Sequence, residues 1–125
     1  MEETRKKILI IEDDQTVHFV LKQVFEKAGY LVFAAMDAMQ GVMMAKQVKP
    51  DVIVLDLMMP AGGGFAVYER LKMMSGSVQV PFLIYSSMER SLISKKIQEG
   101  PLVAILSKSA TIEQVVQAVA LLTAR

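Results

Sequence analysis

Five short apolar segments recur along the chain of 125 residues, and a helix-like pattern follows each of them. They span residues 7–11, 31–35, 51–56, 82–86 and 102–106. The third contains VIVL at 52–55 without polar alternation, which is typical of a strand covered on both faces. Strands that alternate with helices favour a parallel sheet with right-handed crossovers and helices on both faces. The sequence therefore predicts one α/β domain over residues 1–125.

The helical patterns between these segments differ in strength. The clearest covers residues 15–28 and places six apolar side chains on one stripe: Val17, Val20, Leu21, Val24, Phe25 and Ala28. Asp14 precedes this helix as a candidate N-cap, and His18 is placed off the stripe, where we expect a solvated ring. Further helices are predicted at 38–48, at 64–74, at about 89–99, and after the N-cap Thr111. The fourth helix has a thin apolar stripe, which makes it a candidate moving part.

Composition excludes several classes of protein. Fourteen basic and thirteen acidic residues leave a net charge of +1, so charge gives no overall attraction to nucleic acid or to an anionic membrane. The absence of cysteine excludes disulfides and thiolate metal sites. The opening MEETRKK carries charges of both signs, unlike a signal peptide, and no apolar run reaches membrane-spanning length. We expect a cytoplasmic protein that makes no direct contact with nucleic acid or membrane.

Polar residues lie at the ends of four of the five predicted strands: Glu12, Asp13, Asp14, Asp56, Ser86, Ser87 and Lys108. The carboxyl ends of parallel strands meet at one edge, where the sites of doubly wound folds lie. An unpaired carboxylate is costly to bury, so Asp56 is either a local turn device or part of such a site. Like charges about 4 Å apart repel by on the order of 4 kcal/mol at an effective dielectric constant of about 20. Neighbouring acids at this edge therefore need a cation.

Oxygen-rich ligation without cysteine suits Mg²⁺ better than zinc, and we predict Mg²⁺ on Glu12, Asp13 and Asp56. An aspartate carboxylate can act as a nucleophile towards phosphorus and form an aspartyl phosphate. Phosphoryl transfer needs positioning and charge neutralisation, for which the ammonium of Lys108 and the hydroxyl of Ser86 are available. Ser87 remains an alternative for the hydroxyl.

Over its whole length the chain resembles the CheY-like receiver domains of response regulators in two-component signalling. The resemblance is carried by ILIIEDDQ at 8–15, VIVLDLMMPAGGGF at 52–65, Ser86 and Lys108. Ser86 lies 30 residues after Asp56 and Lys108 lies 52 residues after it, separations that agree with those usual in the family. The resemblance implies a flavodoxin-like, doubly wound (βα)5 fold with strand order 2-1-3-4-5.

The resemblance also implies a role for each matching residue. Asp56 is the phosphoacceptor of the phosphorelay, Glu12 and Asp13 bind the metal, and the backbone carbonyl of Met58 also binds Mg²⁺. Pro60 and Gly64 are the turn residues. The donor is a sensor histidine kinase or a histidine phosphotransfer protein. Such a domain is a signalling module that catalyses its own phosphorylation and is not otherwise an enzyme. We expect a monomer or weak dimer, without an effector domain in this chain, whose output is docking to another protein.

Two residues depart from the family pattern close to Lys108. The rotamer-switch position three residues before this lysine usually holds Tyr or Phe, and here it is Ile105. The residue after the lysine is usually a proline in a cis peptide, and here it is Ser109. A cis bond before a residue other than proline costs about 3 kcal/mol, so we predict a trans bond between Lys108 and Ser109. Phosphorylation is expected to be retained and the readout altered.

Three other functions were weighed against phosphorylation. A receiver-like interaction module that no longer depends on phosphorylation is the main alternative, because Ile105 and Ser109 alter the output half of the domain. A nucleotide-binding or flavin-binding enzyme would cradle phosphate with a glycine-rich or hydroxyl-rich first loop, whereas EDDQT repels phosphate. A phosphohydrolase of the haloacid dehalogenase kind would need a second acid where this chain has Met58.

Overall fold

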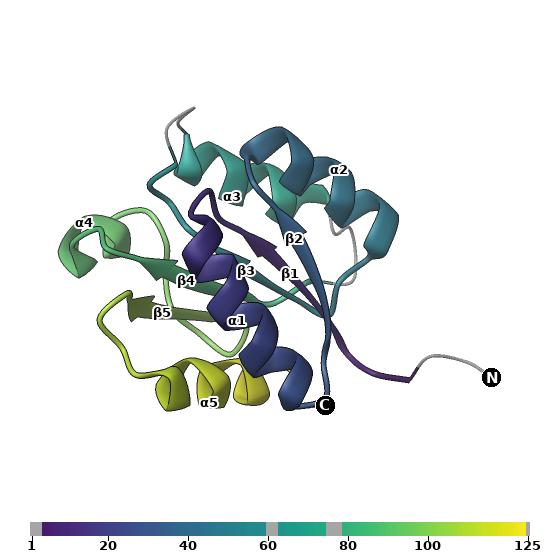
Figure 1. Cartoon of the computed structure of the whole chain (residues 1–125). Helices are drawn as coiled ribbons and strands as arrows, with labels where there is room; N and C mark the ends of the chain where they lie inside the picture. The colour runs from purple at the N-terminus through teal and green to yellow at the C-terminus, as the bar shows by residue number, and fades with distance from the viewer. Residues whose placement is uncertain (1–3, 60–62, 75–78, 125) are drawn as a thin grey trace.

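A computed structural model of the chain describes residues 4–59, 63–74 and 79–124. Within these ranges five strands alternate with five helices (Figure 1): β1 Lys7–Ile11, α1 Gln15–Lys27, β2 Leu31–Ala35, α2 Ala38–Val48, β3 Val52–Leu55, α3 Gly64–Met74, β4 Phe82–Ser86, α4 Arg90–Ser94, β5 Val103–Ser107 and α5 Ile112–Leu122. The strands form one parallel sheet in the order β2-β1-β3-β4-β5. The predicted fold and strand order are confirmed. None of the described helices combines the length and the apolar character that crossing a membrane requires.

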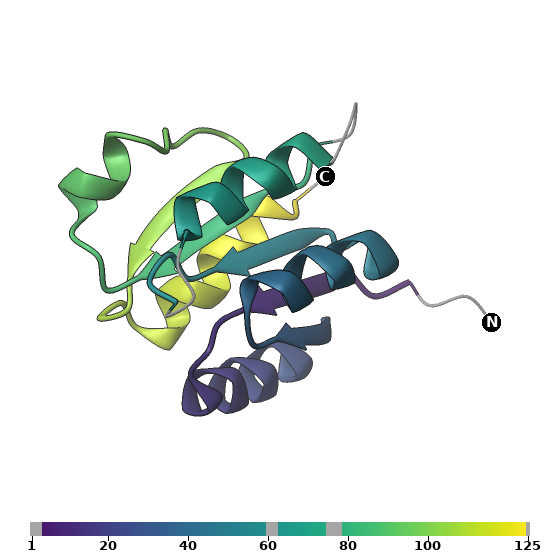
Figure 2. The same cartoon turned by 90° about the horizontal axis from the view of Figure 1, so that it is seen from above.

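The strand order reverses at β1, which pairs with β2 on one side and with β3 on the other (Figure 2). The register places Ile11, the last residue of β1, opposite both Ala35 and Leu55. The residues that follow β1 and β3 therefore leave the sheet side by side. This places Glu12 next to Asp56 at the carboxyl edge, where doubly wound folds build their sites.

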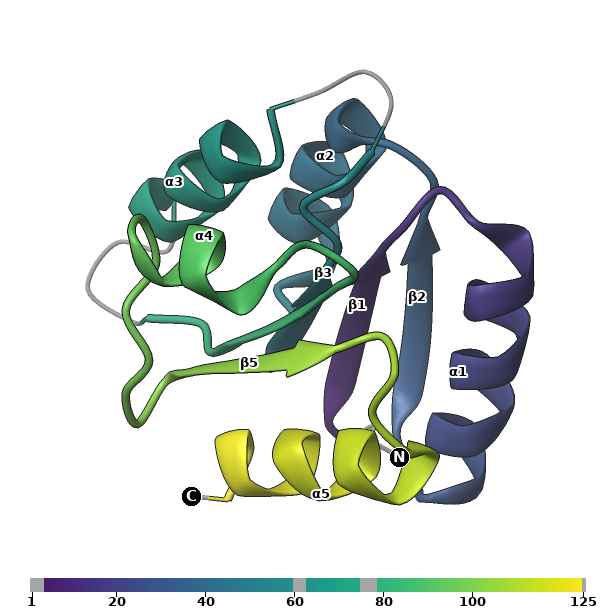
Figure 3. The same ribbon diagram turned by 90° about the vertical axis from the view of Figure 1, so that its left-hand side faces the viewer.

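Each face of the sheet is covered by helices, as predicted. Figure 3 shows α2, α3 and α4 on one side and α1 and α5 on the other. Leu9 and Ile53 pack in the core beneath α2 and α3, whereas Ile8 and Val52 pack in the core beneath α1 and α5. Successive strand side chains point to opposite faces, which explains why β3 is apolar at every position. The central strands are held from both sides, which fixes the strand ends that carry the polar residues.

Side-chain caps set where three helices begin. Oδ1 of Asp14 accepts hydrogen bonds from the backbone N–H groups of Thr16 and Val17 at 2.8 and 3.3 Å. Asp37 caps α2 in the same way, and Thr111 and Gln114 form a reciprocal capping box at α5. These bonds satisfy N–H groups that have no partner within the helix. The prediction that Asp14 is an N-cap is confirmed.

Gly64 opens α3 against the chain that follows β3. A Cβ atom at this position would lie 2.2 Å from the backbone oxygen and 2.4 Å from the Cα atom of Leu57. Backbone atoms cannot yield to such an approach, so only glycine lets α3 begin beside the residue that follows Asp56. Pro60, the other expected turn residue, lies outside the described residues.

The fourth helix is shorter than the predicted span of 89–99, because α4 covers only Arg90–Ser94. Beyond it, the N–H of Ile97 donates to the backbone oxygen of Ile93 at 2.8 Å, so one more turn forms and both isoleucines are buried. Leu92, on the short helix itself, is half exposed. The chain then turns back, and Gly100 pairs with Val103 of β5, which ends the helical course.

Candidate functional site

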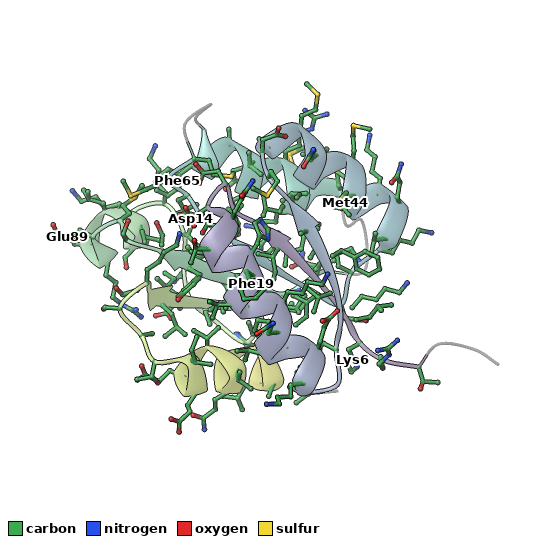
Figure 4. The ribbon with its side chains drawn as sticks, in the orientation of Figure 1. Lys6, Asp14, Phe19, Met44, Phe65 and Glu89 are labelled. Atoms are coloured by element: carbon green, nitrogen blue, oxygen red, sulfur yellow. The ribbon has the colours of Figure 1, made fainter. Side chains whose placement is uncertain are left out.

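The predicted site residues gather at the carboxyl edge of the sheet. Figure 4 labels Asp14, Phe65 and Glu89 near the starts of α1, α3 and α4, which all lie at the edge towards which the strand arrows point. Three acids of this edge, Glu12, Asp13 and Asp56, offer carboxylate oxygens that all lie within 4.8 Å of one another. The predicted convergence of the first loop and the end of β3 is therefore confirmed as geometry.

Asp56 is buried and its position is fixed by three contacts. Its backbone N–H donates to the backbone oxygen of Ile11 at 3.1 Å, which continues the pairing of β3 with β1. Oδ1 accepts from the N–H of Met58 at 3.0 Å, and Oδ2 lies 3.2 Å from Nζ of Lys108. One carboxylate oxygen is thus held by the backbone and the other by a cation. A carboxylate held in this way keeps a defined orientation towards an incoming electrophile.

Glu12 is the second buried carboxylate of the site. Its backbone N–H donates to the oxygen of Ala35 at 3.1 Å, and its Oε2 accepts from the N–H of Asp14 at 3.1 Å. Its Oε1 pairs with Nζ of Lys108. Burial raises the pKa of Glu12 above its ordinary value, and the bonds to Lys108 and Asp14 only partly oppose this effect.

Lys108 brings one positive charge to these two carboxylates from the end of β5. Its backbone N–H donates to the oxygen of Ser86 at 3.2 Å, which directs the side chain across the edge of the sheet. Burial lowers the pKa of Lys108, but its hydrogen bond to Glu12 and the charge of Asp56 more than offset this, so the pKa lies above its ordinary value. The side chain is about a quarter exposed, at 23%.

The donor set of the site fits a divalent cation. Three carboxylates, on Glu12, Asp13 and Asp56, face one ammonium, on Lys108, which leaves a formal charge of −2. Asp13 is exposed whereas the other two acids are buried, so a cation here keeps access to water. Hard oxygen ligands with room for water suit Mg²⁺. Met58, the predicted carbonyl ligand, directly follows the buried Leu57 and has an exposed side chain.

Ser86 ends β4 with a fully buried side chain, whereas Ser87 is exposed. The Ser86 oxygen Oγ accepts from the N–H of Met88 at 3.2 Å, and no hydrogen bond among the described residues joins it to Asp56. Ser86 reaches the site through its backbone bond to Lys108. The hydroxyl of Ser87 instead lies 3.4 Å from the sulfur of Met58. The structure therefore links Ser86 to the site through Lys108, and its hydroxyl makes no hydrogen bond to Asp56 among the described residues.

The prediction of a solvated His18 is wrong, because its ring is buried. Nε2 lies 2.5 Å from the backbone oxygen of Glu12 and 3.1 Å from that of Ala35, so it donates its proton to carbonyl oxygens. Nδ1 is buried without a hydrogen-bond partner. The buried residues of α1 are His18, Leu21 and Phe25, so the histidine extends the buried face of the predicted stripe, on which Leu21 and Phe25 were expected, by one turn. Val20, expected on that stripe, is exposed.

The positions that depart from the expected pattern have defined surroundings. Ile105 is buried in the core beneath α2, α3 and α4. No peptide bond among the described residues is cis, so the bond between Lys108 and Ser109 is trans, as predicted. The Ser109 hydroxyl lies 2.9 Å from that of Ser107. An aliphatic side chain thus stands where the expected pattern has an aromatic ring, and a pair of hydroxyls lies where the pattern has a proline.

Comparison with known proteins identifies the family of the chain. Residues 8–120 match the family model of the response regulator receiver domain. The chain is 38% identical over 92 residues to the DNA-binding dual master transcriptional regulator RpaA of Synechocystis, covering 74% of this chain and 37% of that protein. It is 28% identical over 93 residues to sporulation initiation phosphotransferase F of Bacillus subtilis, covering 74% of this chain and 75% of that one. The match with RpaA thus spans little more than a third of that relative.

Solved structures show the same fold. A chemotaxis protein of Vibrio cholerae, CheY4, superposes with a TM-score of 0.83 at 22% identity, covering 93% of this chain and 97% of that one. A response regulator from Chloroflexus aurantiacus gives a TM-score of 0.83 at 23% identity, covering 98% of this chain and all of that one, at 100%. At these identities the likeness concerns the arrangement of strands and helices.

Proposed function

The chain belongs to the receiver domain family of two-component response regulators, and from this premise we propose that Asp56 accepts a phosphoryl group in a phosphorelay. The proposed donor is the phosphohistidine of a sensor histidine kinase or of a histidine phosphotransfer protein. The proposed metal is Mg²⁺ on Glu12, Asp13 and Asp56, with the carbonyl of Met58 as a further ligand. The same proposal gives the chain a cytoplasmic location and a monomeric or weakly dimeric state.

The proposed reaction is a displacement at phosphorus. An oxygen of the Asp56 carboxylate attacks, a bond from that oxygen to phosphorus forms, and the bond from phosphorus to the imidazole nitrogen of the donor breaks. The released nitrogen keeps the electron pair. Mg²⁺, when bound, neutralises charge on the oxygens of the phosphoryl group. The product is an aspartyl phosphate that carries about −1.5 to −2 charge.

The observation that supports this proposal most is the charge balance around Asp56. A buried nucleophilic carboxylate stands beside two more carboxylates and one ammonium, so the site holds excess negative charge until a divalent cation binds. Lys108 is already within reach of Asp56 and can follow the developing phosphoryl oxygens. A constitutive interaction module has no need for three acids around one lysine.

The experiment that tests the proposal is the intact mass of the protein after incubation with acetyl phosphate, a small phosphoryl donor. Wild type is incubated with Mg²⁺ and without it, and Asp56→Asn is incubated with Mg²⁺. We expect one phosphoryl adduct that needs Mg²⁺ in wild type and none in the variant. Asp51→Asn is the matched control, because Asp51 directly precedes β3 at its opposite end and binds the N–H of Lys7 at 2.7 Å.

Two results would count against the proposal. An adduct of equal yield in Asp56→Asn would show that another residue accepts the phosphoryl group. The absence of any adduct in folded wild type with Mg²⁺ would favour the interaction module that does not depend on phosphorylation.

A further inference from the structure

The outer edge of β5 is closed by contacts within the chain. β5 is the last strand of the sheet, so the backbone groups of alternate residues point away from β4. The N–H and the oxygen of Val103 pair with Gly100 at 3.2 and 3.0 Å, and the oxygen of Ser107 accepts from Ala110 at 2.9 Å. Unpaired edges attract other strands, and these bonds cover both ends of this one.

The middle of this edge is covered by two side chains. Oε2 of Glu99 accepts from the N–H of Ile105 at 3.0 Å, and Nη1 of Arg90 donates to the oxygen of Ile105 at 2.9 Å. Arg90 and Glu99 also form an ion pair with each other. The two side chains and the backbone of Ile105 thus make a closed ring that occupies the place of a neighbouring strand. We call this ring, made of Arg90, Glu99 and the backbone of Ile105, the edge clamp.

The backbone contacts give the edge clamp its specificity. The Arg90 and Glu99 side chains are 57% and 44% exposed, and an ion pair at that exposure contributes little by itself. Each charged group, however, also completes a charge-assisted hydrogen bond to one backbone group of Ile105. The cation at position 90 matches the backbone acceptor of Ile105, and the anion at position 99 matches its backbone donor.

The edge clamp joins two of the chain segments that carry the proposed site, those that end in Ser86 and in Lys108. Arg90 is the first residue of α4 and lies four positions after Ser86, while Ile105 lies three positions before Lys108. On the inner side, the oxygen of Ser86 accepts from the N–H of Lys108 at 3.2 Å. The same two segments are therefore linked at the carboxylates and again at the outer edge of β5.

We infer that the edge clamp holds the loop from Ser86 to Arg90 in its unphosphorylated arrangement and opens when Asp56 is phosphorylated. This inference rests on the proposed function of Asp56. Lys108 already contacts Asp56, so the group that a phosphoryl group draws towards Asp56 is Ser86. The loop that moves with Ser86 then takes Arg90 away from the oxygen of Ile105. Opening exposes the N–H and the oxygen of Ile105 as a free edge. This chain lacks an aromatic switch side chain at position 105. The clamp takes the place of that switch through its contacts with the backbone of the same residue.

The inference has a kinetic consequence if the open arrangement is also the one that reacts with the phosphodonor. The rate of phosphorylation then scales with the population of that arrangement. Weakening the clamp raises the population of that state before any phosphoryl group arrives. Variants without the clamp are therefore expected to be phosphorylated faster than wild type.

The first test is hydrogen exchange at the amide of Ile105, measured by NMR on the full chain without phosphodonor. Glu99→Gln and Arg90→Ala are expected to speed this exchange by about tenfold or more. The first variant removes the charge of the group that accepts from the amide, and the second removes the ion pair that holds this group in place. Lys95→Ala and Glu113→Gln remove exposed charges outside the clamp and are expected to leave it unchanged. Unchanged exchange in both clamp variants overturns the inference.

A charge swap separates the clamp from a simple ion pair. The double variant Arg90→Glu with Glu99→Arg restores attraction between the two side chains but turns an anion towards the oxygen of Ile105 and a cation towards its N–H. We expect exchange at Ile105 to stay fast in this variant. Return of wild-type protection in the swap would mean that the ion pair alone holds the edge, and would overturn the clamp.

The second test is the initial rate of aspartyl phosphate formation from acetyl phosphate with Mg²⁺. The clamp variants and the swap are expected to react about two to ten times faster than wild type, and the control variants at the wild-type rate. Fast exchange at Ile105 with an unchanged or lower rate overturns the coupling to phosphorylation. If wild type forms no adduct, the proposed function fails and the coupling fails with it, while the exchange data still decide whether the clamp exists.

Discussion

The ammonium nitrogen of Lys108 lies 3.2 Å from Oδ2 of Asp56, although the two residues are 52 positions apart in the chain. The same nitrogen pairs with Glu12, so one cation serves two buried carboxylates that come from two other strands. This link between the ends of β1, β3 and β5 is the structural centre of the site. It makes the stability of the domain and the chemistry of the site depend on the same charges.

Replacing Lys108 is expected to destabilise the domain in a pH-dependent way. In buffer without Mg²⁺ at about pH 8, Lys108→Met should lower the free energy of unfolding by about 2 kcal/mol, because two carboxylates lose a charged partner. The pKa of Lys108 is raised in the folded state, so its stabilisation is fully present below the ordinary value of 10.5 and is lost as pH rises through the raised value. Urea unfolding at a series of pH values measures how the difference in the free energy of unfolding between wild type and variant changes with pH.

The control for this measurement is Lys95→Met, which removes an exposed lysine after α4 and should leave stability within about 0.5 kcal/mol of wild type. If the difference in the free energy of unfolding between wild type and Lys108→Met does not become smaller at alkaline pH, the lost stability comes from packing and not from charge.

Glu12 should report metal binding through its protonation. Burial raises the pKa of Glu12 above 4.5, so the folded state binds this proton more tightly than the unfolded state does. Its contribution to stability therefore falls as pH rises from about that ordinary value through the raised value. Mg²⁺ binds the ionised form, so adding it should lower the pKa of Glu12. NMR titration of the side-chain carboxyl carbon, with and without Mg²⁺, measures both effects.

The exposed Glu113 at the start of α5 provides an internal reference in the same spectra, because its resonance should not respond to Mg²⁺. Equal titration curves for Glu12 in the two buffers would exclude it from the metal site.

Gly64→Ala is expected to be strongly destabilising. The new Cβ atom would lie 2.2 Å from the backbone oxygen of Leu57, and neither backbone can move without displacing α3 or the residue that follows Asp56. We expect a loss of about 3 kcal/mol or more, the range of severe steric changes. Gly100→Ala is the matched control, because nothing lies within 4 Å of a Cβ atom at that position. Thermal unfolding of the two variants decides the point, and equal melting temperatures would contradict it.

His18→Leu is expected to loosen the loop that carries Glu12. The imidazole Nε2 donates to the oxygens of Glu12 and Ala35, and leucine leaves the Glu12 oxygen without this donor. Stability should fall by about 1–3 kcal/mol, and the affinity for Mg²⁺ should fall as well. His18→Gln keeps an amide donor and should recover part of both losses. Gln23→Leu, an exposed position on the same helix, should change neither, and a metal affinity unaffected in His18→Leu would limit the histidine to a packing role.

The sequence predicted the sheet better than its surroundings, for physical reasons that individual residues illustrate. The run VIVL at 52–55 is apolar because β3 is covered on both faces, so its pattern is unambiguous. The convergence of Glu12 and Asp56 followed from the rule that parallel strands end at one edge. The burial of His18 could not be predicted from apolar residues alone, because a polar ring is buried once backbone oxygens accept its proton.

The end of α4 was overestimated because its continuation depends on tertiary contacts. Glu99 was assigned to the helix, yet its carboxylate binds the N–H of Ile105 on β5. Helical spacing alone does not show that a charged side chain will hydrogen-bond to the edge of a strand and not continue the helix. The role of Arg90 was missed for the same reason, since its acceptor is a backbone oxygen 15 residues away in the chain.

The position of the phosphoryl group on the chain decides whether Asp56 is the acceptor. An aspartyl phosphate is an acyl phosphate, and borohydride reduces it to an alcohol, so the acceptor becomes homoserine and can be located by sequencing peptides with tandem mass spectrometry. We expect homoserine at position 56 and nowhere else after incubation with acetyl phosphate and Mg²⁺. Homoserine at position 13 or 51, or 2-amino-5-hydroxypentanoic acid (the reduction product of a glutamyl phosphate) at position 12, with aspartate intact at 56, would contradict this expectation.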